Sequence, residues 1–176
     1  MLSVLDAALF ANASYNDSLV EDGTYNGATI IAEQTSSIQG FRAVAFQLSD
    51  QVVIAYRGTD FGLSFDFLSD ILAGWTGAAG TSPQALSAMQ FYAQVQGMTN
   101  LPIVTTGHSL GGGLAGYVAT LTEADAVVFD NMPFEFAAAQ VLTMHAVMTA
   151  IEALGDTLAE AWDNATARPL SFFNDN

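Results

Sequence analysis

Apolar residues form two kinds of pattern along the chain: short, strand-like runs, and longer stretches with helical periodicity that lie mainly in its later two thirds. Short runs rich in β-branched and aromatic residues are typical of buried or half-buried strands. The runs that predict strands are Ala28–Glu33, Phe41–Leu48, Val52–Tyr56, Leu101–Thr105 and Ala126–Phe129. Only three residues separate the second run from the third, and this spacing predicts a hairpin.

The helical signals lie mainly between and after these strands. Ser82 is a good N-cap before Pro83, and apolar residues recur after it at helical spacing. Leu110–Leu121 predicts a second helix, rich in glycine and alanine, and a later apolar stripe runs from Val141 to Trp162. A hairpin followed by alternating helices and strands predicts an α/β sandwich with a mixed, mainly parallel sheet.

The first sixteen residues, "MLSVLDAALFANASYN", predict an opening helix rather than a signal peptide. They carry no basic residue, and Asp6 interrupts the apolar part. The 176 residues suit one domain, 51% of them are apolar, and no apolar run is long enough to cross a bilayer. We see no linker or repeat, so we expect one domain over residues 1–176.

The charge balance narrows the choice of partners. The sequence holds 18 acidic residues against three arginines and no lysine, which gives a formal charge of −15. Such a charge argues against nucleic acid or an anionic bilayer as a steady partner. No cysteine is present, so disulfides and cysteine metal sites are excluded.

One motif carries chemistry. The stretch "GHSLG", Gly107 to Gly111, lies between a predicted strand and a predicted helix. This G-x-S-x-G arrangement is typical of a nucleophile elbow, where a sharp turn exposes a serine at a helix N-terminus. Ser109 is then a candidate nucleophile, and the N–H of Leu110 is a candidate oxyanion donor. The alternatives are a glycine turn needed only for close packing, or a phosphate loop that lacks its lysine.

Three stretches together, "VVIAYRGTD", "DFLSDIL" and "TTGHSLGGGLAGYVA", resemble the class 3 lipases. These are serine esterases of the α/β-hydrolase group and include fungal triacylglycerol lipases. The resemblance covers roughly Phe41 to Asp130. A further stretch, "AVVFDNMPFEFAA", is similar to bacterial lipase-like proteins, some of which are exported without a leader. The resemblance implies an α/β-hydrolase-like fold and hydrolysis of lipid esters through an acyl-enzyme.

The resemblance also implies roles for single residues. Ser109 would be the nucleophile, and the backbone N–H groups of Leu110 and Thr59 would form the oxyanion hole. Asp60–Leu72 matches the position of the family's lid, although an ordinary loop that buries its aromatics is an equal alternative. Arg57 and Asp70 also stand at matching positions, and we interpret them as a structural pair.

The catalytic acid and base are where the chain departs from the family. Asp175, in "RPLSFFNDN", is our candidate acid, and Asp130 is the alternative. The family's histidine follows its acid, but this chain holds only His108 and His145, and we interpret both as structural. We therefore expect the catalytic base to lie beyond residue 176 or on a second chain. In the first case, residues 1–176 are the N-terminal part of a longer domain. The competing functions are an inactive hydrolase-like binding module, one part of a multichain assembly, and a serine peptidase or acyltransferase.

The remaining expectations concern ligands and location. We expect a lipid or small ester as substrate, no nucleic acid partner, no required cofactor and no metal. Calcium at Asn16, Asp17, Glu21 and Asp22 is a weaker alternative to a solvated acidic loop. The acidic, cysteine-free composition and the bacterial resemblance favour secretion, with a cytoplasmic location as the alternative.

Overall fold

The computed structural model describes residues 2–16, 18, 23–36, 40–58, 82–135, 138–139, 141–143 and 145–153. The chain divides into two units, Met1–Gln140 and Val141–Asn176, and each is described by itself. The expectation of one domain over residues 1–176 stays a prediction.

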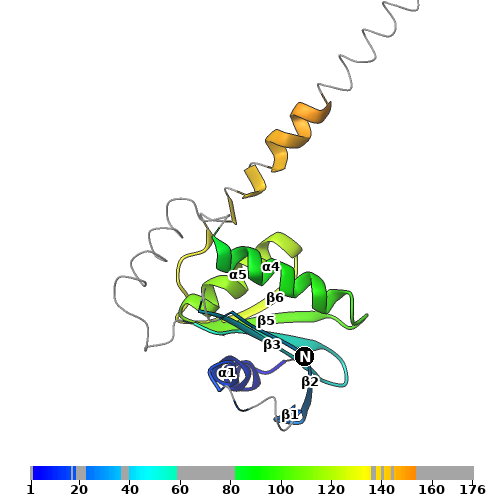
Figure 1. Ribbon diagram of the computed structural model, residues 1–176, viewed down its shortest axis with the longest axis vertical. Coiled ribbons are helices and arrows are strands. Elements are labelled where there is room, and N and C mark those ends of the chain that lie inside the picture. Colours follow the sequence, from blue (N-terminus) through cyan, green and yellow to red (C-terminus); the bar gives the residue numbers. More distant parts are fainter. Residues whose placement is uncertain are drawn as a thin grey trace, which may run out of the picture. The chain divides into compact units, whose positions relative to one another are not determined.

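A six-stranded mixed sheet forms the centre of the first unit (Figure 1). Its strands lie side by side in chain order: β1 (Thr24–Tyr25), β2 (Ala28–Ser36), β3 (Phe41–Gln47), β4 (Val52–Tyr56), β5 (Ile103–His108) and β6 (Asp125–Phe129). The first three pairings are antiparallel, and β4–β5 and β5–β6 are parallel. The mixed α/β sandwich is confirmed, although its parallel part is the smaller share of the described sheet. Tight connections keep β1 to β4 antiparallel, and only the helical crossovers after β4 permit parallel neighbours.

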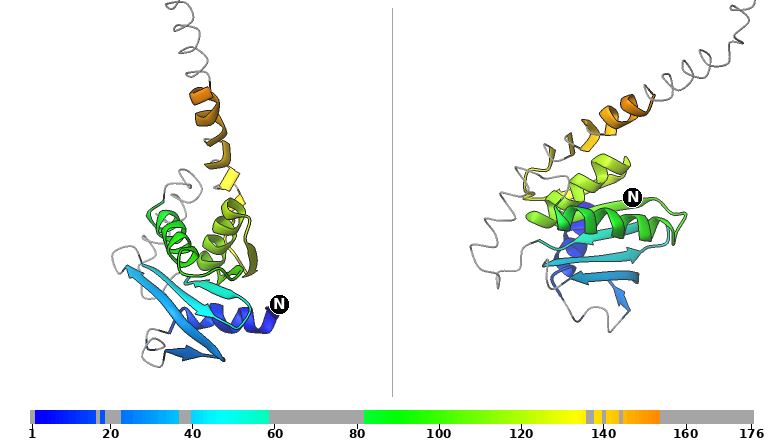
Figure 2. Two further views of the ribbon diagram at one scale, coloured as in Figure 1. Left: turned by 90° about the vertical axis from the view of Figure 1, so that its right-hand side faces the viewer. Right: turned by 45° about the horizontal axis from the view of Figure 1, so that its top comes forward.

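Among the described residues of the first unit, three helices cover the two faces of this sheet. Helix α1 (Val4–Ala13) lies on one face, and α4 (Pro83–Gln96) and α5 (Leu110–Thr122) lie on the other (Figures 1 and 2). The predicted start of α4 is confirmed, because the Ser82 hydroxyl accepts the Ala85 N–H at 3.1 Å and proline follows the cap. The opening helix is also confirmed, capped by Ser3 through the Asp6 N–H.

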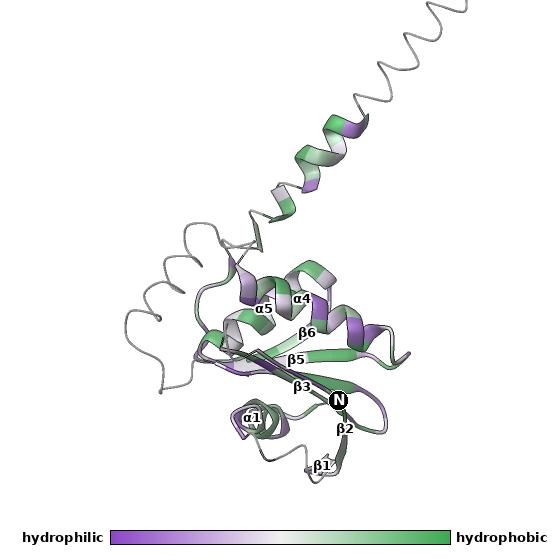
Figure 3. Ribbon diagram, viewed as in Figure 1, coloured by the Kyte–Doolittle hydropathy of each residue, from purple (hydrophilic) through white to green (hydrophobic). Residues whose placement is uncertain are grey.

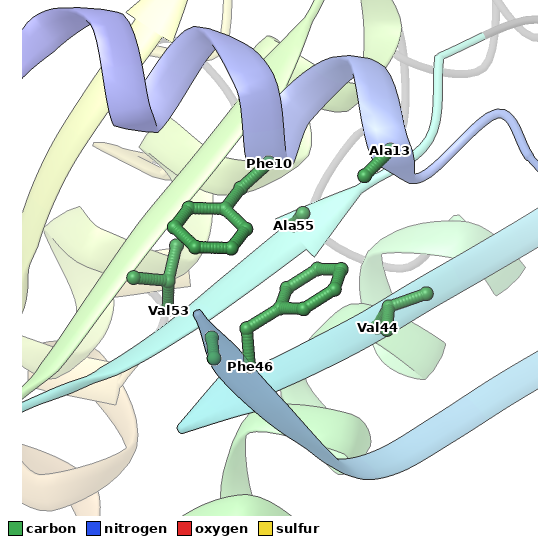
Figure 4. Close-up of a cluster of buried hydrophobic side chains, with 7 residues drawn as sticks. Phe10, Ala13, Val44, Phe46, Val53 and Ala55 are labelled. Atoms are coloured by element: carbon green, nitrogen blue, oxygen red, sulfur yellow. The ribbon is translucent and has the colours of Figure 1, made fainter. Parts of the chain in front are cut away.

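The core on the α1 face joins the first helix to the centre of the sheet. Phe10 and Ala13 of α1 point toward side chains of β3 and β4 (Figure 4). The Phe10 and Phe46 rings lie 4.8 Å apart between centroids. All five residues of β4 are buried, which explains why Val52–Tyr56 is a continuous apolar run rather than an alternating one.

The second unit is helical where it is described, over residues 141–143 and 145–153. This agrees with the apolar stripe predicted from Val141 onward. Figure 3 shows hydrophobic residues along this helical ribbon. The side chains of four apolar residues are exposed: Leu142, Val147, Met148 and Ile151.

Buried Tyr56 leads to a prediction about alkaline pH. Its hydroxyl donates to the Ala88 carbonyl at 3.1 Å, and burial, followed by the proximity of Tyr92, raises its pKa well above the ordinary value. Above about pH 10 the unfolded chain loses this proton before the folded chain does. We therefore expect the free energy of unfolding to fall as pH rises past that point. Urea denaturation at about pH 8 and about pH 11 measures the fall, which Tyr56→Phe should reduce; an identical fall in the variant would contradict the assignment.

Candidate active site

Ser109 lies at the apex of the turn between β5 and α5, as the motif predicts. Its φ of 55° and ψ of −125° are outside the regions that residues with a Cβ readily adopt. The side chain is half-buried and makes no capping bond to the helix. A serine is therefore held in a strained conformation, and its hydroxyl is not used to cap the helix that follows.

Two glycines make this turn sterically feasible. A Cβ on Gly107 would meet the backbone of Gly111 and Gly112. A Cβ on Gly111 would meet the Tyr56 carbonyl oxygen and the backbone that follows it. These neighbours are backbone atoms and cannot rotate away, so Gly111 allows the first turn of α5 to touch the end of β4.

The backbone of Ser109 is fixed from both sides. Its N–H donates to the Phe129 carbonyl at 3.1 Å, and its carbonyl accepts the N–H groups of Gly113 and Met132, each at 3.0 Å. The segment after β6 then continues along α5, where Gly116 leaves room for the Phe134 ring. The exit of β6 is thereby tied directly to the elbow.

The first turn of α5 supplies donors for a developing anion. Leu110 is its first residue, so its N–H has no partner inside the helix and carries the positive end of the helix dipole. β4 and β5 are parallel neighbours with Tyr56 opposite Gly107, so Gly58 leaves β4 beside the elbow. Thr59 lies outside the described residues, and convergence of its N–H with that of Leu110 stays a prediction.

Tyr15 is a site residue that the sequence reasoning missed. It follows α1, and its hydroxyl accepts the Gly58 N–H at 3.1 Å. The same oxygen lies 3.4 Å from Nδ1 and 3.5 Å from the carbonyl oxygen of His108. Burial raises the pKa of Tyr15, against smaller opposing effects of the Gly58 hydrogen bond and the Arg57 charge, so the phenol is neutral at ordinary pH. No spacing in the sequence could connect residue 15 with residues 58 and 108.

A pocket of about 380 Å³ opens beside this tyrosine. Helix α1 forms one wall, and the ends of β5 and β6 form the other. Its lining residues are Ala8, Ala11, Asn12, Tyr15, His108 and Phe129. Half of these side chains are apolar, namely Ala8, Ala11 and Phe129. His108 precedes Ser109 in the sequence, and the Phe129 carbonyl accepts the Ser109 N–H.

Of the two candidate acids, Asp130 lies within the described residues and Asp175 does not. Asp130 directly follows β6, is exposed, and has a positive φ of 43°. Because Phe129 and Met132 both bond to the Ser109 backbone, the Asp130 backbone lies in the segment fixed to the elbow. Asp175 lies outside the described residues, so the preference for it stays a prediction.

The histidines are found in separate units. His108 is the last residue of β5 and is exposed. A structural role as a buried, packed residue is therefore excluded for His108, because the side chain emerges where the sheet ends, although its Nδ1 lies 3.4 Å from the Tyr15 hydroxyl. In the described part of the first unit, the hydroxyl of Ser109 makes no hydrogen bond to His108. His145 belongs to the second unit and lies on an exposed helical segment.

Other expectations fall wholly or partly outside the described residues. These are the lid segment Asp60–Leu72, Asp70, and three of the four residues weighed for calcium, Asp17, Glu21 and Asp22. Arg57 donates to the Gly40 carbonyl at 3.4 Å, which links the end of β4 to the turn before β3. Within the described ranges, no group of three or more histidine or acidic side chains could hold a metal, and no helix is long and apolar enough to cross a membrane.

Comparison with known proteins decides the family. A family model of the phospholipase-like group, the Tle-like phospholipase domain, matches residues 7–165. The chain belongs to this family. The predicted membership in a lipase-like α/β-hydrolase family is thereby confirmed. No curated protein matches the sequence significantly.

Two solved lipase structures resemble the Tle-like domain to different degrees. Lipase II from Rhizopus niveus is 17% identical with a TM-score of 0.51, and the match covers 72% of this chain and 60% of that one. For a lipase from Rhizopus microsporus var. chinensis the identity is 16% and the TM-score 0.46, covering 72% and 55%. The likeness to the Rhizopus niveus enzyme supports the α/β-hydrolase sandwich. The chain spans less than two thirds of either lipase.

The glycine contacts at the elbow predict a large effect of one methyl group. Gly107→Ala should lower the free energy of unfolding by about 3 kcal/mol, because the new Cβ would overlap rigid backbone. Gly97→Ala is the matched control, since its Cβ would lie no closer than 3.4 Å to its neighbours and its φ of −71° suits alanine. We expect the control to be neutral or more stable by about 0.5 kcal/mol in urea denaturation. Equal losses in both variants would contradict the assignment.

The strain at Ser109 predicts a gain in stability on substitution by glycine. Ser109→Gly should raise the free energy of unfolding by about 1 kcal/mol, because glycine adopts this backbone conformation without a clashing Cβ. Ser109→Ala keeps the Cβ and should stay within about 0.5 kcal/mol of the unsubstituted chain. Denaturation of the two variants side by side measures the difference; a glycine variant no more stable than the alanine variant would mean that the turn stores no strain.

Proposed function

We propose that this Tle-like domain hydrolyses carboxylic esters of lipids, with Ser109 as the nucleophile. The single observation that carries the proposal is the strained turn at Ser109, where glycine would be the residue of lower energy. A serine kept at such a position, at a helix N-terminus that its hydroxyl does not cap, is the arrangement that acyl transfer requires. A turn used only for packing has no need of the hydroxyl.

The proposed chemistry proceeds through an acyl-enzyme. The Ser109 oxygen attacks the ester carbonyl carbon while a general base accepts its proton. The carbonyl oxygen becomes an oxyanion, which the N–H groups of Leu110 and Thr59 stabilise. Collapse of this intermediate expels the alcohol, which takes the proton back from the base. Water then repeats the sequence and releases the carboxylic acid, regenerating Ser109.

Both the pocket and the charge of the chain bear on the substrate. The alanines of α1 and Phe129 give the pocket next to the elbow an apolar lining that suits an acyl chain. The name of the family supports a phospholipid, and the Rhizopus niveus neighbour is named a lipase. A formal charge of −15 favours neutral or zwitterionic lipids over anionic ones. The acidic, cysteine-free composition supports action outside the cell as part of the same proposal.

The base and the acid complete the proposal. We keep Asp175 as the candidate acid and Asp130 as its alternative. The Nδ1 of His108 lies 3.4 Å from the Tyr15 hydroxyl, and no hydrogen bond joins His108 to the Ser109 hydroxyl among the described residues. This supports a base that comes from beyond residue 176 or from another chain. Residues 1–176 alone would then retain only the part of the catalysis that the oxyanion hole and substrate binding provide.

Labelling with a fluorophosphonate tests the nucleophile. The probe forms a bond from the serine oxygen to phosphorus and expels fluoride, and the oxyanion hole promotes this step. We expect slow labelling of residues 1–176 at Ser109, identified by mass spectrometry of the labelled peptide, and no labelling of Ser109→Ala. Modification elsewhere, or equal modification of the alanine variant, would contradict Ser109 as the nucleophile and favour the inactive binding module.

Turnover of a p-nitrophenyl ester tests the base in the same preparations. The unsubstituted chain should hydrolyse the ester poorly, and His145→Ala should not change that residual rate. Addition of the histidine-bearing chain or segment should raise the rate by at least about 10³-fold. Robust turnover by residues 1–176 that disappears in His145→Ala would instead assign the base to His145.

A further inference from the structure

We infer that Tyr15 is a positioning residue of this site: its hydroxyl fixes the end of β4, which leads into Thr59, against the last residue of β5, which precedes the nucleophile. The inference rests on the proposed function, because it concerns the geometry of the proposed oxyanion hole. Tyr15 touches neither the substrate carbonyl nor Ser109 in this account. It acts through the two backbone segments that it joins.

Tyr15 follows helix α1, which is held firmly against the sheet. α1 is fixed to the sheet by the buried Phe10 ring and by a hydrogen bond from the Thr106 hydroxyl to the Ala7 carbonyl at 3.2 Å. The helix ends in a turn in which the N–H of Tyr15 donates to the Asn12 carbonyl at 3.1 Å. The position of the phenol is therefore set by the core of the molecule.

The phenol oxygen can serve both segments at once. It accepts the Gly58 N–H at 3.1 Å with a lone pair, and its own proton is left for His108. The His108 carbonyl oxygen lies at 3.5 Å, and Nδ1, which is an acceptor when the ring carries its proton on Nε2, lies at 3.4 Å. Burial keeps this phenol neutral, so the proton is present throughout the ordinary pH range. A phenylalanine ring would keep the apolar contacts but would serve neither segment.

Gly58 is shaped for this contact. A Cβ at this position would clash with the Tyr15 hydroxyl oxygen and lie 2.6 Å from the His108 carbonyl oxygen. Any other residue would push the three groups apart. Glycine at position 58 therefore leaves the space that the phenol oxygen of Tyr15 occupies.

The arrangement lies one residue before Thr59 and two residues before Leu110, the two proposed donors of the oxyanion hole. Gly58 precedes Thr59, and His108 precedes Ser109 and then Leu110. Donors in such a hole must lie within about 3 Å of the oxyanion, and small displacements cost rate rather than binding. Loss of the phenol oxygen should therefore slow bond formation to Ser109 more than it weakens binding of the reagent.

The experiment compares Tyr15→Phe with Tyr25→Phe in the full chain. Tyr25→Phe is the matched control: it also removes one phenol oxygen, from a ring that packs on Phe10 and Phe46 away from the elbow. Two quantities are measured in each variant. One is the exchange rate of the Gly58 amide hydrogen, and the other is the kinetics of fluorophosphonate labelling at Ser109. Thermal denaturation confirms that each variant is folded.

We expect Tyr15→Phe to speed Gly58 exchange and to lower the limiting labelling rate by about 10-fold, with the half-saturating concentration of the probe nearly unchanged. The control should change neither. The inference is overturned if the Gly58 amide exchanges at an unchanged rate in Tyr15→Phe. It is also overturned if labelling weakens only through a higher half-saturating concentration of the probe, with the limiting rate unchanged. Either result leaves Ser109 as the nucleophile. If the unsubstituted chain is not labelled at Ser109 at all, the proposed function and this inference fail together.

Discussion

The close approach of three backbone segments at one edge of the sheet is the constraint on which the site depends. The end of β4, the turn at Ser109 and the segment after β6 lie so near one another that several positions exclude any side chain. Gly107 and Gly111 permit the first two to meet, and the carbonyl of Ser109 binds the third through Met132. Packing of this kind is rigid because backbone atoms cannot change rotamer. Rigidity is what a strained serine needs, since a looser turn would relax and withdraw the hydroxyl.

The same constraint explains the unusual composition of α5. Glycine destabilises a helix interior, yet four of its first seven residues are glycine. Each of the four has a close neighbour that a methyl group would disturb: the end of β4 at Gly111, then Asn131, Met132 and Phe134 along the helix. The helix therefore depends on tertiary contacts for its stability, and those contacts are the ones that shape the elbow. Fold and candidate site share the same residues here.

Much of this could be predicted from local sequence, and the remainder depends on contacts between distant segments. The strands, the cap at Ser82 and the elbow follow from patterns within about fifteen residues, so periodicity and motif reveal them. The strand ends differed: β5 continues to His108 because pairing with β6 extends it past the apolar run. The exposure of His108 could not be predicted, since it depends on where the neighbouring strands end. The role of Tyr15 could not be predicted either, because its partners Gly58 and His108 are 43 and 93 residues away in the sequence.

Those long separations have a consequence for how the site is assembled during folding. The contact between α1 and the end of β5 closes a loop of more than ninety residues, and closure of a long loop is entropically costly and slow. A hairpin such as β3–β4 forms from neighbours and needs no such closure. The candidate site therefore becomes competent late, after the first helix has docked on strands made much later in synthesis. A nascent or partly folded chain would expose Ser109 without the contacts that shape the turn, so the order of folding would itself delay the proposed activity until α1 has docked on β5.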